Sequence, residues 1–171
     1  MTRWTKAGWM MCIGLLTMPA YAGEAHVHGV ASLDVAIEKG LLSIDLDTPA
    51  DNLLGFEHAP RGAAEQQQAD KIAALLGQPE KLFRLSPAAK CVAAKPTLNA
   101  PILSGKNLAD EHSDIETNFT FFCANPAALA NLDVLLFDAF PRLNSIKLQL
   151  AGPKGQRGMT LQKGQRSVSL K

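Results

Sequence analysis

Two neighbouring segments near the start of the chain alternate between hydrophobic and polar residues. From Val27 to Glu38 the odd positions are mostly apolar and the even positions mostly polar, and LLSIDLD (residues 41–47) repeats the pattern. A period of two is typical of a strand with one buried face. Because Glu38-Lys39-Gly40 between the two segments supplies a turn, we expect an antiparallel hairpin.

A helical period replaces this alternation in GAAEQQQADKIAALLGQP (residues 62–79). Apolar side chains recur there at Ala69, Ile72, Leu75 and Leu76, and Gly77 followed by a proline closes the pattern. This spacing predicts one long helix. The next segment, PEKLFRLS (residues 79–86), predicts a shorter helix.

The second half of the chain is dominated by strand patterns. We expect strands in KCVAAKPTL (residues 90–98), with Pro96 limiting its end to a sheet edge, and in DIETNFTFFC (residues 114–123). Residues 103–114 are a polar loop, and LDVLLFDAF (residues 132–140) fits either a buried strand or a short helix. Residues 145–170 predict three short strands separated by turns that contain glycine. The expected class is α+β, with a mainly antiparallel sheet, one long helix and one or two short ones.

The first 22 residues have the pattern of a secretory signal peptide. Arg3 and Lys6 precede an apolar run over residues 7–18, and Ala20-Tyr21-Ala22 is a small-x-small triplet. We expect cleavage after Ala22 and export to the periplasm, leaving a single domain over residues 23–171. The apolar run is too short to span a bilayer comfortably, so no membrane insertion is expected after cleavage.

Composition excludes several classes of ligand. Residues 23–171 contain 15 Lys and Arg against 16 Asp and Glu, a net charge near −1, so the basic footprint of a nucleic-acid-binding protein is missing. Phenylalanine is the only aromatic residue type in this range. A binder of carbohydrate or of single strands is therefore disfavoured, because stacking platforms are usually built from Trp and Tyr as well.

Cys91 and Cys123 are the two cysteines that follow the predicted signal peptide. In an oxidising compartment we expect them to form one disulfide. The alternative is a pair of thiolate zinc ligands, but a lone pair without a C-x-x-C spacing is a poor candidate for such a site.

Three of the four histidines suggest a metal site. His26 and His28 are separated by one residue, so in a strand both imidazoles project from the same face and lean toward one ion. Two imidazoles are too few for tight binding, and His58 in GFEHAP is the expected third ligand. Glu57 beside it is a candidate oxygen ligand or orients an imidazole. The alternative is that these histidines are ordinary solvated or half-buried residues.

The donor set restricts which metal fits. Imidazole and carboxylate suit Zn²⁺, Cu²⁺, Ni²⁺ or Co²⁺, whereas Cu⁺ prefers methionine or free thiolate. Met159 is the only methionine after residue 22, so Cu⁺ handling is disfavoured. Because imidazole must be neutral to coordinate, binding should weaken below about pH 6.5.

Taken in order, these motifs resemble a known family. The H-x-H-G opening, the block LDTPADNLLGFEH (residues 46–58), the helix, the paired cysteines, FPRL and then SIKLQL resemble the zinc-regulated periplasmic zinc-uptake family (ZrgA-like) over nearly all of residues 23–171. The resemblance implies an exported bacterial protein that binds Zn²⁺ and assists its acquisition, with a zinc transporter component as a possible recipient. The implied metal residues correspond here to His26, His28 and His58.

One segment departs from the family pattern. In place of a long insertion rich in His, Asp and Glu, this chain has only NLADEHSDIE (residues 107–116), with the single imidazole of His112. A role as a high-capacity zinc store is therefore in doubt. His112 is either a weak capture ligand or part of a solvated charged loop.

Two rival functions come from other classes. A zinc-dependent periplasmic hydrolase would use a similar ligand set with one open position, but the chain lacks H-E-x-x-H, a G-x-S-x-G elbow and a free thiol, so we do not expect an enzyme. A metal-independent envelope adaptor would instead use strand edges to bind other proteins.

Overall fold

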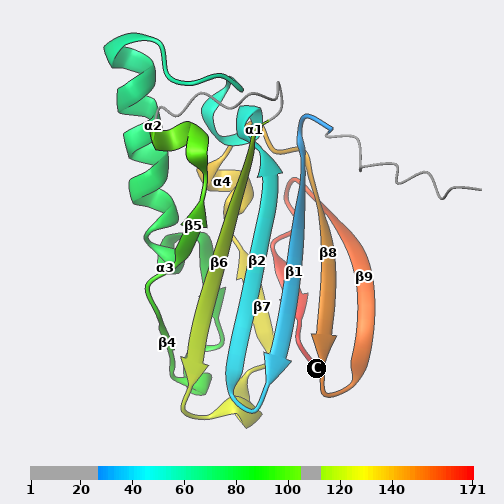
Figure 1. Ribbon diagram of the computed structural model, residues 1–171. Helices are drawn as coiled ribbons and strands as arrows, with labels where there is room; N and C mark the ends of the chain where they lie inside the picture. Colours follow the sequence, from blue (N-terminus) through cyan, green and yellow to red (C-terminus); the bar gives the residue numbers. More distant parts are fainter. Residues whose placement is uncertain (1–26, 105–112) are drawn as a thin grey trace, which may run out of the picture.

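Seven strands form the main sheet, whose long strands lie at the front of Figure 1, with β7 behind them and α2 to one side. The structure, a computed structural model, describes residues 27–104 and 113–171. The strands of this sheet are β1 (Val30–Glu38), β2 (Leu41–Pro49), β4 (Cys91–Ala93), β5 (Thr97–Asn99), β6 (Asp114–Cys123), β8 (Ser145–Gly152) and β9 (Gly155–Gln162). Their spatial order is β4-β6-β2-β1-β8-β9, and β5 also pairs with β6.

The predicted hairpin is confirmed in β1 and β2. The strands pair antiparallel, with Glu38 opposite Leu41 next to the turn. The turn residues Lys39 and Gly40 both have positive φ angles, 48° and 87°, which is the backbone that a two-residue type I′ turn requires. The first strand begins at Val30 rather than at Val27, because residues 28–29 form a turn ahead of it.

One pairing in the main sheet differs from the rest. β1 pairs with β8 in parallel, with Val30 opposite Ser145, while the other strand pairs in both sheets are antiparallel. This pairing places the first described strand in the interior of the sheet, between β2 and β8. Its alternating side chains therefore have one face on the core and one on the open side of the sheet.

A second sheet and a group of helices cover the inner face. The smaller sheet has the order β10 (Ser167–Ser169), β7 (Asn131–Val134), β3 (Phe83–Leu85). The helices are α1 (Ala50–Leu54), α2 (Gly62–Leu76), α3 (Pro79–Leu82) and α4 (Leu136–Ala139), with 3₁₀ turns η1 (Pro87–Ala89), η2 (Pro101–Ser104) and η3 (Pro126–Ala128). α2 confirms the predicted long helix.

Three short segments show how tertiary contacts refine the sequence pattern. The segment expected to be a short helix over residues 79–86 is helical only to Leu82, because Phe83 then pairs with Val134 in the small sheet. The expected strand over residues 90–98 is split into β4 and β5, with Pro96, which has no N–H for a ladder, between them. Residues 132–140 contain both a strand and a helix, β7 and α4.

The hydrophobic core lies between the two sheets and α2. Alternate residues of the long strands are buried and pack with the small sheet and with the apolar stripe of α2. Phe83 from β3 meets Phe119 from β6 edge to face, with ring centroids 5.0 Å apart. Among the largest fully buried side chains are Leu33, Ile44, Leu76, Phe119, Leu132 and Phe140. This packed core holds the strands and helices that carry the surface sites in fixed positions.

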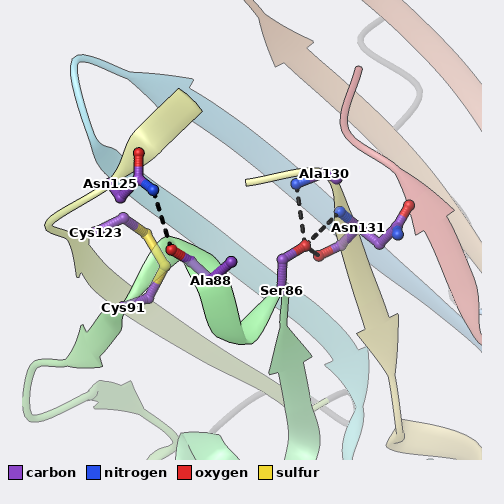
Figure 2. Close-up of a disulfide and its surroundings, with 7 residues drawn as sticks. All are labelled: Ser86, Ala88, Cys91, Cys123, Asn125, Ala130 and Asn131. Atoms are coloured by element: carbon purple, nitrogen blue, oxygen red, sulfur yellow. Dashed lines mark hydrogen bonds between the residues drawn. A yellow bond between two sulfur atoms is a disulfide. The ribbon is translucent and has the colours of Figure 1, made fainter. Parts of the chain in front are cut away.

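The predicted disulfide is confirmed. Cys91 and Cys123 lie directly opposite each other in β4 and β6 and are joined by a sulfur–sulfur bond (Figure 2). Nearby, the Asn125 side chain donates a hydrogen bond to the Ala88 carbonyl, which ties η1 to the chain after β6. The bridge and this hydrogen bond hold the short strand β4 against the end of β6.

These elements confirm the α+β class with a mainly antiparallel sheet, one long helix and one disulfide. Over residues 27–104 and 113–171, no helix combines the length and apolar character needed to cross a membrane.

Candidate metal site

Three short segments meet at the end of the main sheet where β1 begins and β2 ends, at the top of Figure 1. They are the turn at residues 27–29, helix α1 and the loop over residues 55–61 that joins α1 to α2. α1 follows β2 directly, so its side chains lie next to the start of β1. His28, Glu57 and His58, three of the residues predicted as ligands, come from this region.

Asn52 of α1 ties the helix to the backbone beside His28. Its side-chain oxygen accepts a hydrogen bond of 2.5 Å from the Gly29 N–H, and its amide nitrogen donates to the Val30 carbonyl at 2.8 Å and to the Thr48 hydroxyl at 2.9 Å. Asn52 is only 1% exposed. The Gly29 carbonyl in turn accepts from the Asn144 N–H at 2.7 Å, so the backbone next to His28 is held from both sides.

The His28 imidazole lies between two carboxylates. Its Nε2–H donates to Glu57 Oε1 at 3.1 Å, and its Nδ1 is 3.9 Å from Asp51 Oδ2. The second distance is an ion-pair separation and is too long for a hydrogen bond. The ring is 61% exposed, whereas both carboxylates are half-buried. An ion that arrives from solvent therefore reaches His28 and Glu57 without any opening of the fold.

Asp51 also contacts a cation. Arg142 Nη1 is 3.7 Å from Asp51 Oδ1, while the other carboxylate oxygen faces His28. Arg142 lies close to Gly55 as well: a Cβ added to that glycine would be 2.8 Å from Nη2. Gly55 has a φ angle of 87° and ends α1 in the left-handed conformation, which glycine adopts without a steric penalty.

The His58 ring is oriented by its own loop. It stacks on Phe56 with ring centroids 5.0 Å apart, and its Nδ1 is 3.0 Å from the Ala59 carbonyl and 3.7 Å from Glu65 Oε2. A carbonyl only accepts hydrogen bonds, so Nδ1 carries the proton. In the neutral ring Nε2 then has the free lone pair, which is the arrangement found in many metal-binding histidines.

The structure joins some of the predicted residues and leaves others apart. His28 and Glu57 are in direct contact, whereas the His58 ring faces Glu65. Within the described ranges, no group of three or more His, Cys, Asp or Glu side chains is arranged to hold a metal ion. His26 and His112 lie outside the described residues. The ligand set of His26, His28 and His58 therefore stays a prediction.

Asp51, Asn52 and Arg142 were not among the predicted site residues. Asp51 and Asn52 lie just after Pro49, where the strand alternation ends, and Arg142 is far away in the sequence. The one usable signal is Asp51 itself, because acidic residues are enriched in the first turn of a helix, where Asp51 lies in α1. Nothing local to Arg142 indicates its position beside Asp51.

Comparison with known proteins agrees with the resemblance seen in the motifs. The family model described as "ZrgA family zinc uptake protein" matches residues 25–170. A search of curated proteins found no match. The family is one of zinc uptake rather than a known enzyme family, and it is consistent with a periplasmic protein. With nearly the whole chain covered by the match, the chain belongs to the ZrgA family of zinc uptake proteins.

Proposed function

We propose that this protein binds Zn²⁺ as cargo at the end of the main sheet where β1 begins, and that it assists zinc acquisition in the periplasm. The observation that carries the proposal is the contact between His28 Nε2 and Glu57 Oε1. These two donors come from segments 29 residues apart, and both are among the residue types that Zn²⁺ prefers. The choice of zinc rests on family membership, because the general order of affinities of such a site for divalent metals would favour Cu²⁺.

The spacing of this pair suits a tetrahedral ion. Zinc bonds to imidazole nitrogen and carboxylate oxygen are about 2.0 to 2.2 Å long, so two ligands of one tetrahedral zinc lie roughly 3.3 to 3.5 Å apart. The observed separation of 3.1 Å is close to that value. An ion that displaces the shared proton would therefore require only a small movement of either side chain.

His58 is the third proposed ligand. It follows Glu57 in the chain, and its Nε2 carries the lone pair because Nδ1 donates to the Ala59 carbonyl. Nδ1 is the atom that faces Glu65 and the Ala59 carbonyl, so coordination requires the loop over residues 55–61 to carry Nε2 toward His28 while the Nδ1–Ala59 hydrogen bond is kept. His28 lies in the turn ahead of β1, so the strand spacing expected for His26 and His28 does not apply. His26 is the proposed fourth ligand only because it lies two residues before His28, with water as the substitute. His112 is retained only as a weak capture ligand.

Asp51 and Arg142 are proposed to tune the site rather than to bind the ion. Asp51 faces the His28 nitrogen opposite the one that contacts Glu57. Asp51 is not hydrogen-bonded to the ring at 3.9 Å. When Nε2 binds an ion, Nδ1 carries the ring proton, and a small approach of Asp51 would then orient the imidazole and raise its basicity. Arg142 balances part of the negative charge of Asp51. The pair therefore adds little net charge beside His28, and neither residue occupies a ligand position.

Zinc affinity measured by competition with a chromogenic chelator tests this proposal. We expect one tight Zn²⁺ per chain, a loss of at least about 100-fold for H28A combined with H58A, and a smaller loss for Glu57→Gln. Glu80→Gln, in α3, is the matched control and should bind like the parent. If the double variant binds zinc like the parent, the proposed site is wrong.

A further inference from the structure

Three exposed apolar side chains form a row across the opposite end of the main sheet. Leu41, Phe122 and Val92 are direct cross-strand neighbours on β2, β6 and β4. They are 37%, 56% and 70% exposed, while the residues beside them in β2 and β6, Leu42 and Phe121, are buried. The row begins at the turn between β1 and β2, at the bottom of Figure 1. A nine-residue strand separates it from the proposed zinc site, roughly 30 Å.

The row lines a shallow groove. The hollow has a volume of about 660 Å³, and its lining includes the three apolar side chains together with Lys39, Lys90 and one carboxylate, Glu38. The hollow is open to solvent along its length, so it offers a shallow binding surface and not an enclosed ligand pocket. The Cys91–Cys123 bridge holds the wall that carries Lys90 and Val92 against the end of β6 (Figure 2). The groove is thus a fixed feature of the fold.

Both lysines of the groove have an unfavourable backbone conformation. Within the described ranges, Lys39 and Lys90 are the only residues other than glycine with positive φ angles, 48° and 51°. For a residue with a Cβ atom this conformation costs roughly 1 to 2 kcal/mol, and glycine or asparagine tolerates it better. The turn between β1 and β2 requires this backbone at Lys39, and the end of η1 requires it at Lys90. A lysine at each of these two turn positions places an ammonium group next to each end of the apolar row.

The ammonium groups are available to an anion. Lys39 Nζ is 3.5 Å from Glu38 Oε1, and both side chains are largely exposed, so this ion pair is weak and exchangeable. Lys90 has no ion-pair partner among the described residues. A ligand with an apolar group and at least one carboxylate therefore complements this surface. The apolar group would contact the row of Leu41, Phe122 and Val92, and the carboxylate would contact a lysine ammonium group.

Size and shape distinguish the possible occupants. A stable dimer buries about 800 Å² on each partner, and three partly exposed side chains offer only a few hundred. A membrane surface is met by an apolar face that extends over a whole helix or sheet, whereas this row has only three apolar side chains and lies in a shallow hollow beside Glu38. We propose that this groove binds a short peptide segment of another protein, in which an apolar side chain is flanked by carboxylates.

Selection from a phage-displayed library of random short peptides tests the proposal with the full exported chain. We expect enriched peptides to combine aromatic or aliphatic residues with Asp or Glu. A synthetic copy of the most enriched peptide, labelled with fluorescein, should then bind in a polarisation assay. Because each exposed charge pair contributes modestly, Lys39→Asn combined with Lys90→Asn should weaken that binding about tenfold, and F122S should abolish most of it.

The lysine variant also separates a binding role from a structural one. Asparagine accepts the left-handed backbone, so K39N with K90N should leave thermal stability unchanged or raise it while peptide binding falls. Lys147→Asn is the matched control: this exposed lysine lies on β8, outside the groove, and its loss should change neither property. Zinc affinity should be the same in all of these variants, since the zinc site is at the other end of the sheet.

Three results would overturn the inference. The first is no enrichment of peptides, or enriched peptides that bind the K39N/K90N variant and F122S like the parent. The second is sedimentation of the parent with vesicles of phosphatidylglycerol and phosphatidylethanolamine that F122S abolishes, which would assign the groove to a membrane surface. The third is a dimer of the parent, seen by analytical ultracentrifugation, that F122S dissociates, which would assign it to a second copy of this chain.

Discussion

Asn52→Ala should destabilise the protein more than its small change in size suggests. The amide of Asn52 makes three hydrogen bonds, to the Gly29 N–H, the Val30 carbonyl and the Thr48 hydroxyl. Alanine fills none of these positions, and Asn52 is almost fully buried, so water does not replace the lost partners without opening the site. The variant therefore leaves the Gly29 N–H, the Val30 carbonyl and the Thr48 hydroxyl without the partner that Asn52 provides.

A buried polar group that loses its partner costs about 1 to 3 kcal/mol. With three groups affected and the Val30 carbonyl only partly buried, we expect the free energy of unfolding to fall by about 3 to 5 kcal/mol. This is a large part of the 5 to 15 kcal/mol typical of a folded domain. Urea denaturation followed by far-ultraviolet circular dichroism measures the difference directly.

Asn99→Ala is the matched control for this experiment. Asn99 makes a single exposed hydrogen bond to Glu116, so its loss should change the free energy of unfolding by no more than about 0.5 kcal/mol. A loss at Asn52 as small as the loss at Asn99 would refute the reasoning. It would mean that α1 and the backbone beside His28 are held by contacts other than this amide.

Replacement of both Cys91 and Cys123 by serine should lower the free energy of unfolding, measured by urea denaturation, by about 3 to 4 kcal/mol. The reason is that the bridge closes a loop with a sequence separation of 32 residues. A loss below about 1 kcal/mol would contradict the loop-entropy argument. Gly29→Ala should lower the melting temperature more than Gly62→Ala, since both glycines have nearly the same φ, 82° and 81°, but only at Gly29 would the added Cβ meet a neighbour, Asn144 Nδ2 at 2.4 Å; equal shifts would show that this neighbour moves freely. Zinc release, followed with the chromogenic chelator, should increase as the pH is lowered toward 5, because protons compete for the imidazole nitrogens; affinity that is independent of pH would argue against histidine ligands.

Local patterns were enough to predict the long elements and the disulfide. The alternation in residues 27–47 and the helical spacing in residues 62–76 each depend on which face is buried, and that is encoded within the segment itself. The pairing of Cys91 with Cys123 followed from their number and from the expected compartment. The parallel pairing of β1 with β8 was not predictable in this way, because a strand's own alternation does not identify a distant partner.

For the candidate site, the sequence predicted which types of residue would be present, but it did not predict which of them would be in contact. Glu57 was expected beside His58 because the two are adjacent in sequence, yet it contacts His28. Neighbouring side chains in a bent loop point in different directions, so adjacency in sequence says little about contact. Asn52 was missed because a buried amide leaves no periodic signal, and Arg142 because its contact with Asp51 depends on the whole tertiary fold.

The parallel pairing of β1 with β8 also determines when the proposed zinc site can assemble. The Gly29 carbonyl accepts hydrogen bonds from the Asn144 and Ser145 N–H groups, and β1 acquires its second neighbour only when residues 145–152 are in place. Until β8 is in place, β1 is an open edge of the sheet, and the backbone beside His28 is held from one side only, by Asn52. At the proposed site, ion loading would therefore follow the pairing of β1 with β8.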